Sequence, residues 1–220
     1  MTPGKPLPII YAGHSVWLLP EHALWWPGGR ILFVADLHLG KAATYRALGQ
    51  PVPSGTTAEN LRRLNQLINH YLPLHMVFLG DFLHAQHART ASVIGQMRLW
   101  RQSHANLHCT LVRGNHDSLA GDPPADLRIS VVDEPYIVGP FAACHHQQKH
   151  DTHAVLAGHL HPTAQLHGPA RDRLRLPCFV FEERRAILPA FGEFTGGYRV
   201  AAQPGLQLYA AGGQTVWRLP

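Results

Sequence analysis

Residues 30–38, RILFVADLH, contain an uninterrupted apolar run, residues 31–35, that is followed directly by Asp36-Leu37-His38. The run has the length of a strand and does not alternate between apolar and polar residues, which is typical of a strand buried on both faces. Two similar segments occur further along, residues 74–81 (LHMVFLGD) and residues 107–117 (LHCTLVRGNHD). The three segments therefore predict strands of one parallel or mixed sheet, each ending in polar residues.

Amphipathic segments separate these three strands. Residues 56–72 and 90–103 carry apolar side chains at three- and four-residue steps, the pattern of a helix with one buried face. The resulting strand–helix–strand order implies right-handed crossovers and an α/β fold. We expect one domain over residues 1–220, with residues 162–177, rich in Arg, Pro and Gly, as a surface excursion. Further short strands are expected at residues 9–12, 16–19, 23–26, 129–132, 136–138, 142–144, 154–157 and 178–181.

Metal-binding side chains follow the predicted strands. Asp36 and His38 are two residues apart, so on extended chain they point the same way. Asp81 follows a glycine that permits a tight turn, and its two carboxylate oxygens can bridge two ions. Residues 158–161 (GHLH) again place two imidazoles, His159 and His161, at a strand end. Because ligands bind at the carboxyl edge of open α/β sheets, the clusters predict one metal centre.

The segment GNHD at residues 114–117 is the most specific of these clusters. Asn115 offers a neutral amide oxygen, which suits a metal that also carries water. His116 is expected to address the substrate and not to bind a metal. Asp117 is expected to orient His116 through a hydrogen bond, as carboxylates beside metal centres often do.

The four clusters, in this order from Asp36 to His161, resemble the calcineurin-like metallophosphoesterase superfamily. That resemblance implies a four-layer α/β/β/α sandwich of two mixed sheets flanked by helices, with two metals at one edge. It also implies a metal-dependent phosphoesterase. By the resemblance one metal would be held by Asp36, His38, Asp81 and His161, and the other by Asp81, Asn115, His159 and one further histidine.

That further histidine lies in residues 142–147, AACHHQ. Family members usually place it two residues before a proline. The segment fits if Gln147 stands where the proline would be, which makes His145 the ligand and His146 its neighbour in the active site. Because the proline is missing, His146 remains the alternative ligand.

The ligand set contains nitrogen and oxygen donors and no thiolate. Such a set suits two ions of Mn²⁺, or of Fe or Zn²⁺, better than Mg²⁺ or Ca²⁺, which avoid imidazole. We expect a hydroxide that bridges the two metals to attack the phosphorus in line. His116 would stabilise charge or protonate the leaving oxygen.

Longer motifs resemble a narrower bacterial family, the ligase-associated DNA-damage-response endonucleases (the PdeM family). They are LWWP at residues 24–27, ADLHLGK at 35–41, GQPVPSGTT at 49–57 and LGDFLHA at 79–85. This resemblance implies a manganese-dependent phosphodiesterase or endonuclease acting on DNA, with single-stranded DNA as one candidate substrate, in DNA repair with a DNA ligase, a helicase and an exonuclease.

The charge of the chain is compatible with a DNA partner. The formal net charge is +5 and the pI is near 9.4, which favours an anionic partner. Trp25 and Trp26 are considered for base stacking, although at least one is expected in the core. The side chains expected to contact substrate beside the metals are Lys41, His84, Arg89 and His146.

Other features exclude several classes. Three widely spaced cysteines favour neither a disulfide framework nor a cysteine zinc site. We find no apolar run of the roughly 18–20 residues that span a bilayer and no signal peptide, and we expect a cytoplasmic protein without a membrane partner. The oligomeric state is not predicted.

Two other function classes remain open. A phosphatase, or a phosphodiesterase of cyclic nucleotides or other small molecules, would use the same centre. A non-catalytic scaffold of the same fold is the second alternative, and the complete ligand set with His116 argues against it.

Overall fold

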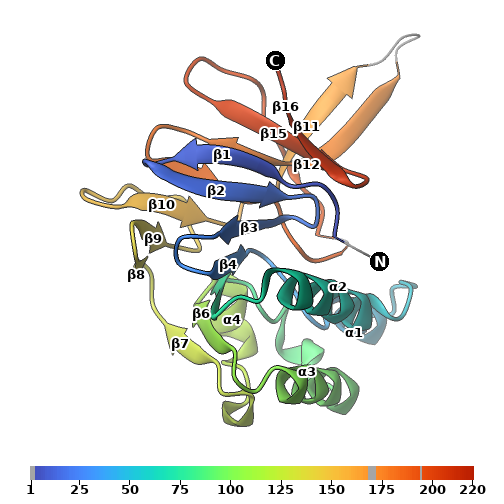
Figure 1. Ribbon diagram of the computed structural model, residues 1–220. Coiled ribbons are helices and arrows are strands. Elements are labelled where there is room, and N and C mark those ends of the chain that lie inside the picture. Colours follow the sequence, from blue (N-terminus) through green and yellow to red (C-terminus); the bar gives the residue numbers. More distant parts are fainter. Residues whose placement is uncertain (1–2, 168–171, 194) are drawn as a thin grey trace.

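The computed structural model describes residues 3–167, 172–193 and 195–220 and consists of two mixed β-sheets packed face to face, with helices along one of them (Figure 1). The strands of the first sheet are β1 (Leu7–Tyr11), β2 (His14–Leu19), β3 (Ala23–Trp26), β4 (Ile31–Val34), β5 (His75–Leu79), β6 (His108–Val112) and β7 (Ser130–Val132). Those of the second are β8 (Tyr136–Val138), β9 (Phe141–Ala143), β10 (Ala154–Ala157), β11 (Pro162–His167), β12 (Arg173–Phe181), β13 (Arg185–Ile187), β14 (Tyr198–Arg199), β15 (Gln207–Gly212) and β16 (Thr215–Arg218).

The first sheet follows chain order from β1 to β7, antiparallel up to β4 and parallel from β4 to β7. The second has the order β14-β11-β12-β13-β10-β9-β8, and β15 and β16 join it through β12. All four residues of β4 are buried, as the uninterrupted apolar run predicted. The expected sandwich of two mixed sheets with helices is confirmed. The fourth layer is not, because the described helices all precede β7 and none covers the second sheet.

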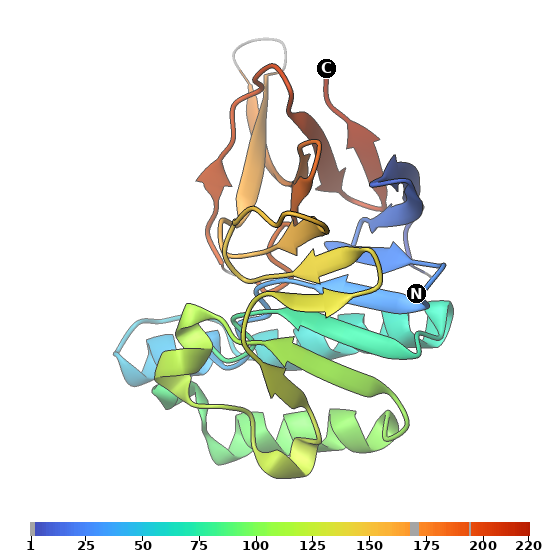
Figure 2. The ribbon, with the colours of Figure 1, turned by 90° about the vertical axis from the view of Figure 1, so that its left-hand side faces the viewer.

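The helices are α1 (Lys41–Ala47), α2 (Thr56–Tyr71), α3 (Ala91–Ser103) and α4 (Asn115–Ala120), with short 3₁₀ turns at Gln86–Ala88 and Ala125–Leu127. Figure 2 shows them on the outer side of the first sheet, away from the second. The two long helices were predicted within one residue. Thr90 caps α3 by accepting the Val93 amide at 3.2 Å. Helix α2 ends where Leu72 turns to φ 47°, just before Pro73.

Two hydrophobic cores follow from these layers. The buried stripes of α2 and α3 pack on one face of the first sheet, and the other face packs on the second sheet. Trp25 lies against Tyr71 in the core between the helices and the first sheet. Trp26 contacts Phe141 in the core between the two sheets, with ring centroids 5.3 Å apart. Packing therefore accounts for both tryptophans, and Trp26, which pairs with Ile31 at the start of β4, lies away from the carboxyl end of that strand.

Residues 162–177 were expected as a surface excursion, and the described part of this range forms two paired strands: residues 162–167 are β11, and residues 173–177 are the first half of β12. The order Arg173-Leu174-Arg175-Leu176 is an alternating pattern, which suits a strand. The segment's prolines and glycine concealed that period. Helices α1 and α4 were also missed, because each is short. No helix in the described parts of the chain is long and apolar enough to cross a membrane.

Candidate metal centre and active site

The predicted ligands come together at one edge of the sandwich. Strands β4, β5 and β6 are parallel to one another in the first sheet, as are β9 and β10 in the second. Their carboxyl ends therefore bring five loops to one place. These loops carry Asp36 and His38 after β4, Asp81 after β5, Asn115 after β6, His145 after β9, and His159 and His161 after β10.

One group of donors consists of Asp36, His38, Asp81 and His161, whose ligand atoms all lie within 4.8 Å of one another. The Nε2 atoms of His38 and His161 are 3.3 Å apart. His38 Nε2 is 3.7 Å from Asp81 Oδ2, and His161 Nε2 is 3.6 Å from Asp36 Oδ1. Four nitrogen and oxygen donors thus face one small volume.

A second group shares Asp81 with the first. His145 Nε2 lies 3.5 Å from Asp81 Oδ1, 2.9 Å from Asn115 Oδ1 and 3.0 Å from His159 Nδ1. Asp81 therefore presents Oδ2 to one group and Oδ1 to the other. This is the arrangement that a carboxylate bridging two ions needs.

Backbone carbonyls fix the tautomer of three histidines. The Nδ1–H groups of His145, His161 and His116 donate to the carbonyls of Leu79 (3.0 Å), Thr195 (3.0 Å) and His84 (2.6 Å), respectively. A carbonyl oxygen can only accept, so Nδ1 carries the proton and the Nε2 lone pair faces the centre. Partners of this kind orient metal-binding histidines in many proteins.

The backbone is unusual at most of these ligands. Five of them have positive φ angles in the left-handed region, which non-glycine residues rarely adopt. They are Asp36 (52°), His38 (46°), Asp81 (52°), His159 (68°) and His161 (50°). Conformations of this kind concentrate at functional sites, where the surrounding fold holds them in place.

Two glycines allow the close approach of the ligands. A Cβ atom at Gly80, whose φ is 80°, would lie 2.1 Å from His145 Nδ1. A Cβ at Gly114 would lie 2.4 Å from Asp81 Oδ1. Both motifs therefore need glycine, because a side chain there would displace a ligand.

The carboxylates are buried and repel each other. Asp36 and Asp81 are 0% and 2% exposed. Burial, with a further contribution from the Asp36 charge, raises the pKa of Asp81. Cations between these groups would remove the repulsion, and the imidazole and amide donors around them suit transition metals. The residues present therefore fit the divalent ions implied by the motifs.

Asp117 does not make the predicted hydrogen bond. Its Oδ1 accepts the amides of Phe82 (2.9 Å) and Leu83 (3.1 Å), and its Oδ2 accepts that of Gly114 (3.0 Å). Burial raises the pKa of Asp117 to about 6. Both oxygens are thus occupied in holding the loops that carry Asp81 and Asn115, and the expectation that Asp117 bonds to His116 is wrong.

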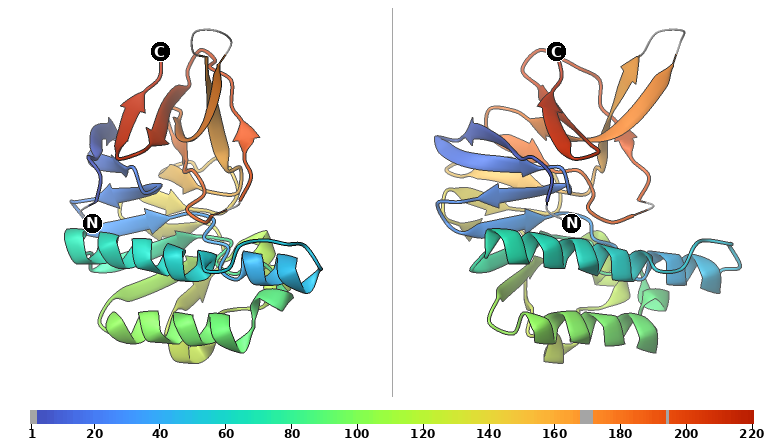
Figure 3. Two further views of the ribbon diagram at one scale, coloured as in Figure 1. Left: turned by 90° about the vertical axis from the view of Figure 1, so that its right-hand side faces the viewer. Right: turned by 45° about the vertical axis from the view of Figure 1, so that its right-hand side comes forward.

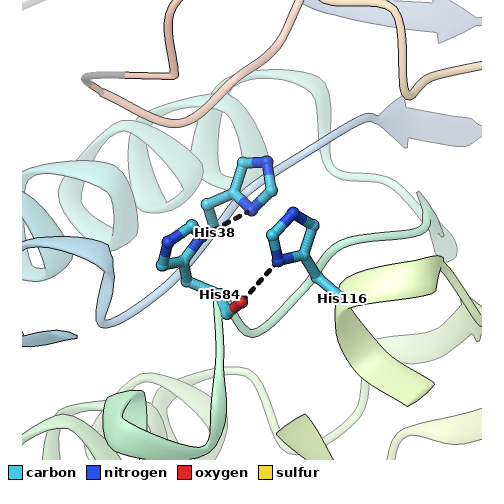
Figure 4. A group of neighbouring side chains, drawn as sticks. All are labelled: His38, His84 and His116. Atoms are coloured by element: carbon cyan, nitrogen blue, oxygen red, sulfur yellow. Dashed lines mark hydrogen bonds between the residues drawn. The ribbon is translucent and has the colours of Figure 1, made fainter. Parts of the chain in front are cut away.

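His116 is oriented instead by His84 (Figure 4). Besides accepting the Nδ1–H of His116 with its carbonyl, His84 stacks its ring on that of His116 with centroids 4.9 Å apart. The Nδ1 atoms of His84 and His38 are 3.4 Å apart. His84 thus links a predicted metal ligand to the predicted catalytic histidine, a role that the sequence did not suggest.

The other expected substrate contacts have different surroundings. Lys41 is buried at the start of α1, and this burial lowers the pKa of its ammonium group. The negative charges of Asp81 and Asp36 act in the other direction and raise that pKa by a smaller amount. Arg89 Nη1 donates to the carbonyl of Asp122 at 2.7 Å, and to those of Ala120 and Gly121. That guanidinium nitrogen therefore anchors the chain after α4.

Glu134 supports the loop after β9 and was not singled out from the sequence. Its Oε2 accepts the amides of His145 (2.7 Å) and His146 (2.9 Å), and its Oε1 contacts His146 Nδ1 at 2.7 Å. No motif spacing connects Glu134 to this loop, so only the fold reveals the contact. It directs the His146 ring toward Glu134, while His145 lies between Asp81 and Asn115.

The family model for calcineurin-like phosphoesterases matches residues 29–138, the part of the chain that includes the first three clusters. The crystal structure of the Pseudomonas putida nuclease MPE superposes with a TM-score of 0.86 at 47% sequence identity, covering 98% of this chain and 100% of that chain. The chain belongs to the calcineurin-like phosphoesterase family.

It is accordingly a metal-dependent phosphoesterase, from a family that uses divalent metals. The structure of Yfce, a phosphoesterase from E. coli, is far less similar, with a TM-score of 0.42 and 12% identity over 86% of this chain and 97% of that chain. No curated protein sequence matches this phosphoesterase.

The two neighbouring histidines of the phosphoesterase are expected to differ in metal binding. His145→Ala should weaken Mn²⁺ binding by at least about 10-fold, since even outer partners of metal ligands have effects of 10- to 100-fold. His146→Ala should keep the affinity within about 3-fold, because its ring pairs with Glu134. Titration of each variant with Mn²⁺, followed by electron paramagnetic resonance, measures both. The reverse order of effects would make His146 the ligand, which its place near His145 and His159 permits.

Proposed function

We propose that this phosphoesterase uses two divalent ions, preferably Mn²⁺ with Fe or Zn²⁺ as alternatives, to hydrolyse phosphodiester bonds in DNA. The observation that carries the proposal is the pair of donor groups that share Asp81, one on each carboxylate oxygen. Two ions so placed are the arrangement of many phosphodiester-cleaving sites.

The ions would be held by the ligands found at the edge of the sandwich. Asp36, His38, Asp81 and His161 would hold one, and Asp81, Asn115, His145 and His159 the other. When bound, such ions activate water at neutral pH and neutralise the phosphoryl oxygens.

The chain's own residues would position the substrate and transfer the proton. His116 donates its Nδ1–H to the His84 carbonyl, so Nε2 is left free to take up a proton and, when protonated, to donate to a phosphate oxygen or to the leaving oxygen. Its backbone amide donates to Asp81 Oδ1 at 3.0 Å, which ties the catalytic loop to the bridging carboxylate. Lys41 and His84 lie beside these groups, where they would contact the phosphate.

The DNA substrate is supported by two observations. The relative that is 47% identical is a nuclease, and the chain carries a formal net charge of +5. A basic protein gains affinity for nucleic acid by releasing counterions from the phosphates. The motif resemblance to ligase-associated repair endonucleases extends the proposal to DNA repair alongside a ligase, a helicase and an exonuclease.

A comparison of ester substrates with added Mn²⁺ tests this function. The phosphoesterase should hydrolyse bis-p-nitrophenyl phosphate, a diester, faster than the corresponding monoester. It should also cleave at least one of single-stranded, duplex and nicked DNA. A preference for the monoester would support the phosphatase alternative, and turnover of the diester without any cleavage of DNA would support a small-molecule phosphodiesterase.

A further inference from the structure

Strands β11, β12 and β14 place three arginines on one face. In this part of the sheet Arg173 pairs with His167, Arg175 with Gln165, and Arg199 with Thr163. Paired residues lie on the same side of a sheet, and residues two apart on one strand do as well. We call this set the arginine face, and its members are Thr163, Gln165, Arg173, Arg175 and Arg199.

The continuation of β12 shows which way this face points. Phe179 and Phe181 are odd-numbered residues of β12, as Arg173 and Arg175 are, so all four point to the same face of the strand. The two phenylalanines are buried in the core between the two sheets. The even-numbered residues Cys178 and Val180 point to the opposite face, where they lie in a separate hydrophobic cluster. The arginines therefore lie on the face of the second sheet that is turned toward the first sheet. At the start of β12 this face continues beyond the core and is exposed.

The arginine face begins at the metal centre. Strand β11 starts one residue after the predicted ligand His161, whose carbonyl accepts the Tyr198 amide at 3.0 Å. Arg175 donates from Nε to Thr163 Oγ1 at 2.8 Å and from Nη2 to the carbonyl of Gly197. Figure 3 (right) shows β11 and β12 rising on the side of the molecule where α1 lies.

Among the residues that the structure describes, no carboxylate neutralises the charges of this face. Five arginines elsewhere, at positions 62, 63, 98, 113 and 185, each lie within 4.0 Å of a carboxylate. Arg173, Arg175 and Arg199 are exposed, and none makes such an ion pair with a described residue. Unpaired arginines in a row suit a ligand with repeated negative charges.

We propose that the arginine face binds the phosphate backbone of DNA beyond the bond that is cleaved. This inference rests on the proposed function. From Pro162 to His167 the strand β11 extends about 17 Å, at about 3.4 Å per residue. One strand of a duplex has a phosphate every 3.4 Å along the axis, so the face covers about five nucleotides. Guanidinium groups bind such phosphates without regard to sequence.

A charge-reversal variant tests the arginine face. Arg173→Glu combined with Arg199→Glu should raise the KM for a long oligonucleotide by about 10-fold or more. It should leave kcat, and the rate with bis-p-nitrophenyl phosphate, within about 2-fold. The dependence of binding on salt should weaken by about one unit of slope for each lost phosphate contact. Oligonucleotides too short to reach the face should show little change in KM.

Arg184 supplies the matched control, because it is exposed just beyond the opposite end of β12. Arg184→Glu makes the same charge change and should leave the KM for DNA within about 2-fold. An unchanged KM in the double variant would overturn the inference, and so would an equal loss with the small diester, which would indicate a structural role.

Binding without cleavage separates this inference from the proposed function. A fluorescent oligonucleotide is titrated with the His116→Ala protein in Mn²⁺, with and without the two charge reversals. Weaker binding only when the arginines are reversed supports the arginine face even if the wild-type protein cleaves no DNA. Equal binding by both proteins contradicts it even if the wild-type protein is a nuclease.

Discussion

Replacing His116 by alanine is expected to lower the turnover of bis-p-nitrophenyl phosphate by about 10²- to 10⁴-fold, the usual contribution of a positioned proton donor or acceptor. Mn²⁺ binding should stay within about 3-fold of wild type. The reason is geometric: the His84 carbonyl fixes the proton on His116 Nδ1, and Nε2 is left for the substrate. Steady-state kinetics at saturating Mn²⁺ and metal titration give the two quantities.

His87→Ala is the control for His116→Ala, because His87 is an exposed histidine in the loop after Asp81 and should change neither quantity. The structure also permits His116 to be a metal ligand, since His116, His38 and His84 have possible ligand atoms within 4.8 Å of one another. If His116→Ala loses bound metal along with turnover, His116 is a ligand and its assigned role is wrong.

Replacing Asp81 by asparagine should strongly lower the activity of the metal-loaded enzyme and leave the metal-free protein as stable as wild type or more stable. The asparagine side chain has only one oxygen, so it cannot place an oxygen in both donor groups as Asp81 does. Loss of the stabilisation that a metal provides, worth several kcal/mol, corresponds to about 10³-fold or more in turnover. Without metal the variant should melt at the same temperature as wild type or higher, because its neutral side chain no longer repels Asp36.

Thermal unfolding with and without Mn²⁺ measures this second effect. Mn²⁺ should raise the Tm of the wild-type protein and leave that of Asp81→Asn nearly unchanged, since a ligand stabilises only the state that binds it. Asp126→Asn changes an exposed carboxylate that pairs with Arg98 and should respond to Mn²⁺ as wild type does. An equal rise in Tm for Asp81→Asn would show that Asp81 does not hold the metals.

Much of the fold was predictable because the pattern of apolar and polar residues that marks a strand or a helix lies within a short stretch of sequence. The uninterrupted run before Asp36 and the amphipathic stripe of α2 each show their environment in a few consecutive residues. The clusters around Asp36, Asp81 and Asn115 could be assigned to one centre because parallel strands end at one edge. His145, from the second sheet, also reaches that centre, although its motif lacks the usual proline.

The supporting contacts were not predictable, because they join segments that are distant in sequence. Asp117 accepts amides from a loop 34 and 35 residues away, and no local pattern records this. Glu134 and the His84 carbonyl act through the fold in the same way. The arginines of β12 were visible as composition, but their common face depends on the register with β11.

The central claim is that Asp81 joins two metal ions in one centre, and anomalous diffraction from crystals grown with Mn²⁺ tests it most directly. We predict two peaks about 3.5–4 Å apart, the usual separation in two-metal sites, with one oxygen of Asp81 on each. One ion should contact Asp36, His38 and His161, and the other Asn115, His145 and His159. A single peak at saturating Mn²⁺, or two peaks without Asp81 between them, would contradict the account.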